Sequence, residues 1–153
     1  MKAIAICQPY AEMIARGTRL VVNRTWYTDY RGTLAIHAGR SRGWFDGADE
    51  SQDIRAADCQ FGAIIAVADL YACLHISHFQ MGCYLRAIPA QIPFARGPYC
   101  WLLRKVVRVK PFPVRGQQGL FDCPFTLQYL PTNPGAPGNN PTKLRRVLKE
   151  MIR

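Results

Sequence analysis

Arginine and aromatic side chains occur together over a short stretch near the start of the chain. Arg24, Trp26 and Arg31 lie around a turn between two apolar segments, and Arg40 and Arg42 follow the second of these segments. A guanidinium group donates paired hydrogen bonds to a phosphate, and an aromatic ring stacks on a nucleobase. These residue types at this spacing predict contacts with a ligand that carries phosphates and bases.

Each of these side chains also has a structural interpretation. An arginine between apolar strand residues, such as Arg24, can be buried and paired with a carboxylate, for which Asp69 and Asp29 are the candidates. Aromatic residues of small β-proteins belong to the core more often than to a binding surface. His37 has no Cys or Ser partner at a recognisable spacing, which favours a structural role, and Glu12 is expected to be a surface charge on the polar side of its helix.

The charge of the whole chain agrees with an anionic partner. Lys and Arg number 20 against 10 Asp and Glu, which gives a net charge of +10 at pH 7 and a pI near 9.7. Residues 46–60 are the exception, with five acidic residues and one basic residue. A polyanion is the first partner that this balance predicts, although a basic pI alone does not separate a binder from a protein that is simply basic.

The cysteines and histidines do not show the spacing of metal ligands. The 6 cysteines occur singly, without a C-x-x-C pair, and His75 and His78 lack a third ligand nearby. Most of the cysteines lie among apolar residues, as Cys100 does between Tyr99 and Trp101. We therefore expect reduced cysteines that act as small hydrophobic residues, with no metal, no cofactor and no disulfide.

Length and hydropathy predict one globular domain. The chain has 153 residues, and none of its apolar runs approaches the roughly 20 residues of a membrane span. The first nine residues turn polar too soon for a signal peptide. The sequence therefore predicts a soluble, cytoplasmic protein that does not enter a membrane.

The elements that must position these side chains are mostly strands. Apolar and β-branched residues between turn signals predict strands over Lys2–Cys7, Arg19–Arg24, Thr33–His37, Phe61–Cys73, Tyr99–Val109 and Leu120–Phe121. A short helix over Tyr10–Arg16 is expected to end at Gly17, and Ile76–Arg96 has mixed signals. The fold class is α+β, mainly β: a small, partly open β-barrel with flanking helices and a C-terminal helix.

The C-terminal part divides by composition. Residues 1–130 form the expected domain, residues 131–141 are a linker rich in Pro, Gly and Asn, and residues 142–153 have the pattern of a basic amphipathic helix. The apolar face of this helix can dock on the barrel, and its basic face can contact phosphates. It is also a possible surface for a protein partner.

Three blocks of this sequence resemble the activating-signal-cointegrator homology (ASCH) domain, a branch of the PUA-like superfamily. The first block runs from Gln8 to Ile14 and into Gly17. The second is Asn23–Thr28 with Tyr30–Gly32 and the strand to His37. The third is Gly97–Leu103, followed by Pro113–Gly116 and Gly119–Phe121. The blocks occur in the family's order and span about residues 2–124.

The resemblance implies a small, partly open PUA-like barrel with a cleft beside its first helix. PUA-like domains mostly bind RNA, and ASCH members are linked to nucleic acids and to transcription coactivation. One bacterial relative is an amidohydrolase that acts on N-acetylated cytidine, and another is linked to RNA cleavage. Tyr10 stands where the family usually has Trp, so the resemblance places Tyr10 at the cleft.

The family's catalytic-type motif, Gly-x-Lys-x-x-Glu-x-Arg, is only half present. The amidohydrolase has Thr in place of Glu, and the corresponding residues here are Gly17, Arg19, Val22 and Arg24. A general base must lose and regain a proton near neutral pH, whereas Arg19 stays protonated and Val22 has no functional group. The chain is therefore expected to bind rather than to catalyse, with Arg19 as a phosphate contact.

These observations predict a nucleic-acid-binding module, for RNA rather than DNA, with a basic cleft for a phosphate and a base. The expected contact residues are Tyr10, Arg19, Arg24, Trp26, Arg31, His37, Arg40, Arg42, Tyr99 and Arg115. The alternative is a hydrolase of a modified nucleoside or of single-stranded RNA, and a third possibility is an adaptor that binds a protein through the C-terminal helix.

Overall fold

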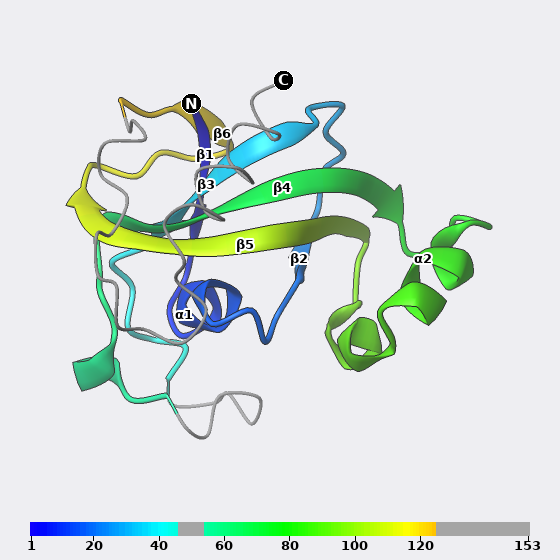
Figure 1. Cartoon of the computed structure of the whole chain (residues 1–153), viewed down its shortest axis with the longest axis horizontal. Coiled ribbons are helices and arrows are strands. Elements are labelled where there is room, and N and C mark those ends of the chain that lie inside the picture. Colours follow the sequence, from blue (N-terminus) through cyan, green and yellow to red (C-terminus); the bar gives the residue numbers. More distant parts are fainter. Residues whose placement is uncertain (46–53, 125–153) are drawn as a thin grey trace.

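A six-stranded mixed sheet forms the centre of the computed structural model, which describes residues 1–45 and 54–124 (Figure 1). The strand order is β2-β5-β4-β3-β1-β6, in which β1 and β3 are parallel and the other neighbours are antiparallel. The strands are β1 (Lys2–Ile6), β2 (Val21–Arg24), β3 (Gly32–Ala38), β4 (Ala63–His75), β5 (Tyr99–Pro113) and β6 (Leu120–Asp122). The prediction of a mainly β, partly open barrel is confirmed.

The two long strands give the sheet its curvature. The register between β4 and β5 shifts at three places, and bulges of this kind bend a strand and increase its twist. Strand β5 continues to Pro113, four residues beyond the predicted end at Val109. Its prolines are tolerated because Pro111 falls within a register shift and Pro113 is the last residue of the strand.

The helices lie at different ends of the sheet (Figure 1). Helix α1 (Tyr10–Ala15) packs against β3, β4 and β5, and the chain leaves it at Gly17, which has a φ of +77°. Left-handed backbone of this kind suits glycine, so the predicted helix end is confirmed. Helix α2 (Met81–Ala87) and the 3-10 helix η3 (Pro89–Phe94) resolve the mixed signals of Ile76–Arg96, and a one-turn 3-10 helix, η2, covers Ala56–Asp58.

Helix α1 is buried from Ala11 to Ala15, which makes one prediction wrong. Glu12 is only 5% exposed and is not a surface charge. Its carboxylate pairs with Arg108 Nη2 on β5 at 2.5 Å and with Arg16 Nε at 3.0 Å. Because the sheet curves around α1, the polar side of this helix faces β5 instead of water.

The sheet carries its apolar core on both faces. Trp101, Ile14 and Leu34 are fully buried in the cluster between α1 and the sheet, and Ala35, Ile64 and Val67 lie in a second cluster on the other face. All six cysteines are free thiols. Among residues 1–45 and 54–124, no three metal-ligating side chains gather, and no helix is long and apolar enough to cross a membrane. The predicted linker and C-terminal helix lie outside the described residues.

Candidate functional site

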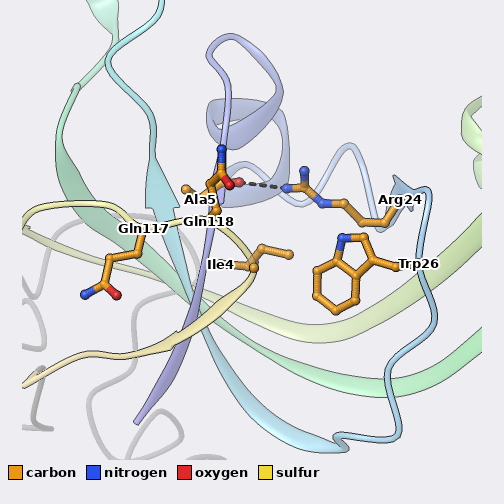
Figure 2. Close-up of a pocket in the computed structure, with 7 residues that line it drawn as sticks. Ile4, Ala5, Arg24, Trp26, Gln117 and Gln118 are labelled. Atoms are coloured by element: carbon orange, nitrogen blue, oxygen red, sulfur yellow. Dashed lines mark hydrogen bonds between the residues drawn. The ribbon is translucent and has the colours of Figure 1, made fainter.

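Arg24, the last residue of β2, reaches across the open side of the barrel. Its Nη2 donates a hydrogen bond to the carbonyl oxygen of Ala5 on β1 at 2.7 Å (Figure 2). Its Nε is buried and has no hydrogen-bond partner in the part of the chain that the structure describes. Burial lowers the pKa of Arg24 from its ordinary value, and a smaller coulombic effect of Cys7 opposes this shift.

The predicted carboxylate partners of Arg24 are absent, so that structural interpretation is wrong. Asp69 pairs with Arg104, whose Nε lies 2.6 Å from the Asp69 Oδ2. No ion pair joins Arg24 to Asp29 or to any other carboxylate of residues 1–45 and 54–124. Strands β4 and β5 bring Asp69 opposite Arg104 in the register, which fixes the partner of Asp69. Arg24 is left as a half-buried cation whose hydrogen bond within these residues goes to a neutral carbonyl.

A cleft with a volume of about 440 Å³ opens beside α1 and is bounded by Arg24. Its apolar floor consists of Ile6, Ile14 and Val22. The other lining residues are polar, basic or aromatic: Cys7, Tyr10, Arg19, Asn23, Trp44 and Arg96. The structure thus brings together three of the predicted site residues, Tyr10, Arg19 and Arg24.

One wall of the cleft is a stack of a cation and aromatic rings. The Arg19 guanidinium lies over the Tyr10 ring at 4.8 Å and over the Phe94 ring at 5.3 Å, and its Nε donates to the Val21 carbonyl at 3.0 Å. The Trp44 ring meets Tyr10 edge to face at 6.2 Å and is 54% exposed. Arg19 is therefore held in place from several sides, and the Trp44 ring remains available for stacking.

The Asn23 side chain holds the backbone of Arg96 beside the cleft. Its Oδ1 accepts hydrogen bonds from the backbone N–H groups of Arg96 at 3.0 Å and Gly97 at 2.9 Å, and its Nδ2 donates to the Phe94 carbonyl at 2.8 Å. Sequence reasoning missed Asn23, Arg96, Trp44 and Cys7 as lining residues. The available signal was Asn23 itself, because Asn is depleted in strands and indicates a side-chain task there.

A second hollow, of about 400 Å³, lies on the other side of Arg24 (Figure 2). It is lined by Ile4 and Ala5 of β1, by Trp26, and by the loop residues Gln117 and Gln118. The Trp26 ring meets Trp101 edge to face at 4.7 Å, so one side of this predicted stacking residue belongs to the core.

A third hollow, of about 380 Å³, contains three more of the predicted residues, His37, Arg40 and Arg115. His37 is 2% exposed, and its Nε2 lies 2.8 Å from the Val114 carbonyl oxygen, so Nε2 carries the proton in that contact. The imidazole thereby fastens the loop that carries Arg115 to β3.

The remaining predicted residues line none of these three hollows. Arg31 Nη1 donates to the carbonyls of Thr28 and Tyr30, at 2.8 and 2.7 Å. The Arg42 guanidinium lies over the Phe61 ring at 4.3 Å. Tyr99 pairs with Arg24 in the register of β2 and β5, and its ring contacts Tyr27 and His75.

The cleft lining offers little for acid–base chemistry. Among the described residues that line it there is no His, Asp, Glu, Lys, Ser or Thr, and Cys7 and Tyr10 are the remaining groups with a transferable proton. A nucleophile needs an adjacent base, and the described lining provides no such pair. Its arrangement of cations and rings suits the binding of an anionic, aromatic ligand.

Comparison with known proteins agrees with the resemblance seen in the sequence. No protein-family model matches the chain. Over 87 residues, which are 50% of this chain, it is 32% identical to Activating signal cointegrator 1 of Mus musculus, and it spans only 15% of that protein's length.

Two solved structures from Zymomonas mobilis are also similar. An ASCH protein, at 14% identity and a TM-score of 0.44, is covered over 94% of its chain by 98% of this one. A point variant, at 15% identity and a TM-score of 0.47, is covered over 85% of its chain by 78% of this one. The match to Activating signal cointegrator 1 supports the resemblance to the ASCH domain family that the three blocks along residues 2–124 carry.

Proposed function

We propose that this chain is a nucleic-acid-binding module, for RNA rather than DNA, that holds a nucleotide unit in the cleft beside α1. The observation that carries the proposal is the half-buried Arg24, whose Nε has no hydrogen-bond partner and whose guanidinium has no carboxylate partner in the described residues. A buried cation is costly unless an anion compensates it. A phosphate in the cleft supplies that anion and accepts hydrogen bonds from the guanidinium.

The rest of the cleft suits the other parts of a nucleotide. Trp44 and Tyr10 offer aromatic faces and edges to a base, and base–aromatic stacking contributes about 1–3 kcal/mol per base. Arg19 and Arg96 add positive charge to the same walls, and the described lining contains no acidic residue. The choice of RNA is supported by the ASCH resemblance, since PUA-like domains mostly bind RNA.

The test is fluorescence anisotropy with single- and double-stranded RNA and DNA at low and at physiological salt. We expect single-stranded RNA to bind most tightly, and Arg24→Gln to weaken binding about tenfold or more, the loss of a hydrogen bond to a charged group. Arg86→Gln is the matched control, because it removes an exposed arginine on α2 that lines none of the three hollows.

The two variants distinguish binding in the cleft from nonspecific attraction of a nucleic acid to a basic protein. Equal affinities of Arg24→Gln and Arg86→Gln would contradict the proposal, because both remove one positive charge. Circular dichroism and a melting curve of Arg24→Gln show whether its fold is intact, and Arg96→Gln, at the rim of the same cleft, provides a second reading of binding.

A further inference from the structure

The three hollows lie next to one another and share lining residues, and together they are called the depression. Arg24 lines both the cleft and the second hollow, and Ala5, Gln117 and Gln118 line both the second and the third hollow. Figure 2 shows the middle of this depression, where Arg24 and Trp26 face the β1 strand and the loop of Gln117 and Gln118. The hollows thus follow one another from the cleft, by way of Arg24, to the loop between β5 and β6.

The far end of the depression carries two arginines that the cleft does not use. Arg40 and Arg115 are exposed, line the third hollow, and make no ion pair within residues 1–45 and 54–124. The described linings of all three hollows contain no Asp or Glu. The far end is thus a second place where an anionic group meets only positive or neutral side chains.

Two close backbone approaches lie at this end of the depression. The Arg40 side chain lies against Gly62, where a Cβ atom would come within 2.9 Å of the Arg40 Nε. Gly116 covers the imidazole of His37, where a Cβ would come within 2.7 Å of Cε1, and the His37 bond to the Val114 carbonyl anchors the same loop. The loop that carries Arg115 is therefore held at a defined place, as a phosphate contact requires.

His37 contributes a second sign that this end is built for a ligand. Its Nε2 donates to the Val114 carbonyl, whereas its Nδ1 is buried without a partner in the described residues. A buried polar atom without a partner is unusual in a folded protein. It lies in the one hollow that also has two unpaired arginines.

We infer that the depression binds a single strand of nucleic acid, with a nucleotide in the cleft and a phosphate further along the same strand at Arg40 and Arg115. This inference rests on the proposed function. Gln117 and Gln118 lie between the two ends and offer amide groups to the backbone of the strand. A single strand fits this assignment better than a duplex, because a duplex must first unpair and unstack the base that enters the cleft, at a cost of about a few kcal/mol.

The experiment is a length series of uridylates, from the monophosphate through the di-, tetra- and octanucleotide, titrated by calorimetry. In the unmodified protein we expect affinity to rise at least tenfold between the monophosphate and the tetranucleotide. The double variant Arg40→Gln/Arg115→Gln is expected to bind the monophosphate unchanged and to lose that gain. Its salt dependence with the octanucleotide should flatten by about 1.4, since each phosphate contact on a single strand contributes about 0.7 to the slope.

The control removes the same charge elsewhere. Arg86→Gln/Lys105→Gln changes two exposed residues that line none of the hollows, and it should retain the length dependence. The inference is wrong, while the cleft proposal stands, if the two double variants have the same affinity as each other for every uridylate in the series. The same holds if a blunt RNA duplex competes as well as the single strand. If no uridylate binds and Arg24→Gln changes nothing, the proposed function itself fails.

Discussion

Two charges near α1, the buried Glu12 and the half-buried Arg24, differ in what surrounds them. Glu12 lies between Arg16 and Arg108, which contact its carboxylate at 3.0 and 2.5 Å. Its backbone N–H donates to the Gln8 Oε1 at 2.9 Å. Arg24, in contrast, has one hydrogen bond to a neutral carbonyl and a buried Nε without a partner. One charge is compensated inside the fold, and the other is not.

The difference agrees with a structural role for Glu12 and with the ligand contact that we propose for Arg24. A compensated buried ion fixes the elements that it joins, here α1 and β5, and loses stability when one partner is removed. An uncompensated buried cation instead destabilises the free protein and gains from an anion that arrives later. The Glu12 carboxylate thus joins α1 to β5, and the Arg24 guanidinium is the group that the proposed function assigns to the ligand.

The largest expected effect is on stability and comes from the compensated site. Glu12→Gln should lower the free energy of unfolding by about 3 kcal/mol, the lower end for a broken buried pair, because Arg16 and Arg108 stay partly exposed. Urea unfolding measures it. Asp122→Asn is the matched control, since it removes an exposed carboxylate paired with Lys2 and should cost less than about 1 kcal/mol. Equal losses would mean that burial of Glu12 adds nothing.

Replacement of Arg24, the uncompensated charge, should change the stability of the free protein little. Arg24→Gln loses the hydrogen bond to Ala5 but also removes a desolvated charge, so its unfolding free energy in the absence of ligand should change by less than about 1 kcal/mol. Addition of uridine monophosphate should raise the melting temperature of the unmodified protein and not that of the variant. A large loss of stability without ligand would make Arg24 a structural residue and remove the contrast with Glu12.

Much of the framework could be predicted from local patterns. The strand that ends at Arg24 and the helix that ends at Gly17 have clear boundaries, because apolar runs and a glycine stop are local signals. The position of Tyr10 in the cleft also agrees with the family pattern. These features depend on residues that are neighbours in the sequence.

The partners of the buried and half-buried charges could not be predicted from local sequence patterns. Glu12 meets Arg108 across 96 positions, and Asn23 holds the backbone of Gly97 across 74. Such pairs depend on the register of β5 against its neighbours, with three shifts that the sequence pattern does not reveal. The sequence therefore indicated that Arg24 is buried between strands but not that it lacks a carboxylate partner.

Two cysteines, one near Arg24 and one near Glu12, allow both sites to be followed by thiol labelling. The expected effect, a change of a few-fold in labelling rate, is the smallest of those predicted. Cys7 lines the cleft next to Arg24 and is partly exposed, whereas Cys59 is buried beside Glu12 and Arg108. Burial raises the pKa of the Cys59 thiol, with Glu12 adding to the effect, so this thiol stays protonated at neutral pH and resists alkylation. N-ethylmaleimide should therefore label Cys7 in the native protein and leave Cys59 unlabelled.

Ligand binding should then separate the two sites further. A uridylate in the cleft should slow the labelling of Cys7 several-fold and leave that of Cys83, exposed on α2, unchanged; peptide mass spectrometry measures both rates. Cys59 should react only in Glu12→Gln, where the loss of the buried ion pairs loosens α1 against β5. Protection of Cys7 and Cys83 to the same extent would place the ligand outside the cleft. The labelling rate of Cys7 depends on the ligand, and that of Cys59 depends on the fold. One labelling experiment therefore tests the Arg24 site and the Glu12 site independently.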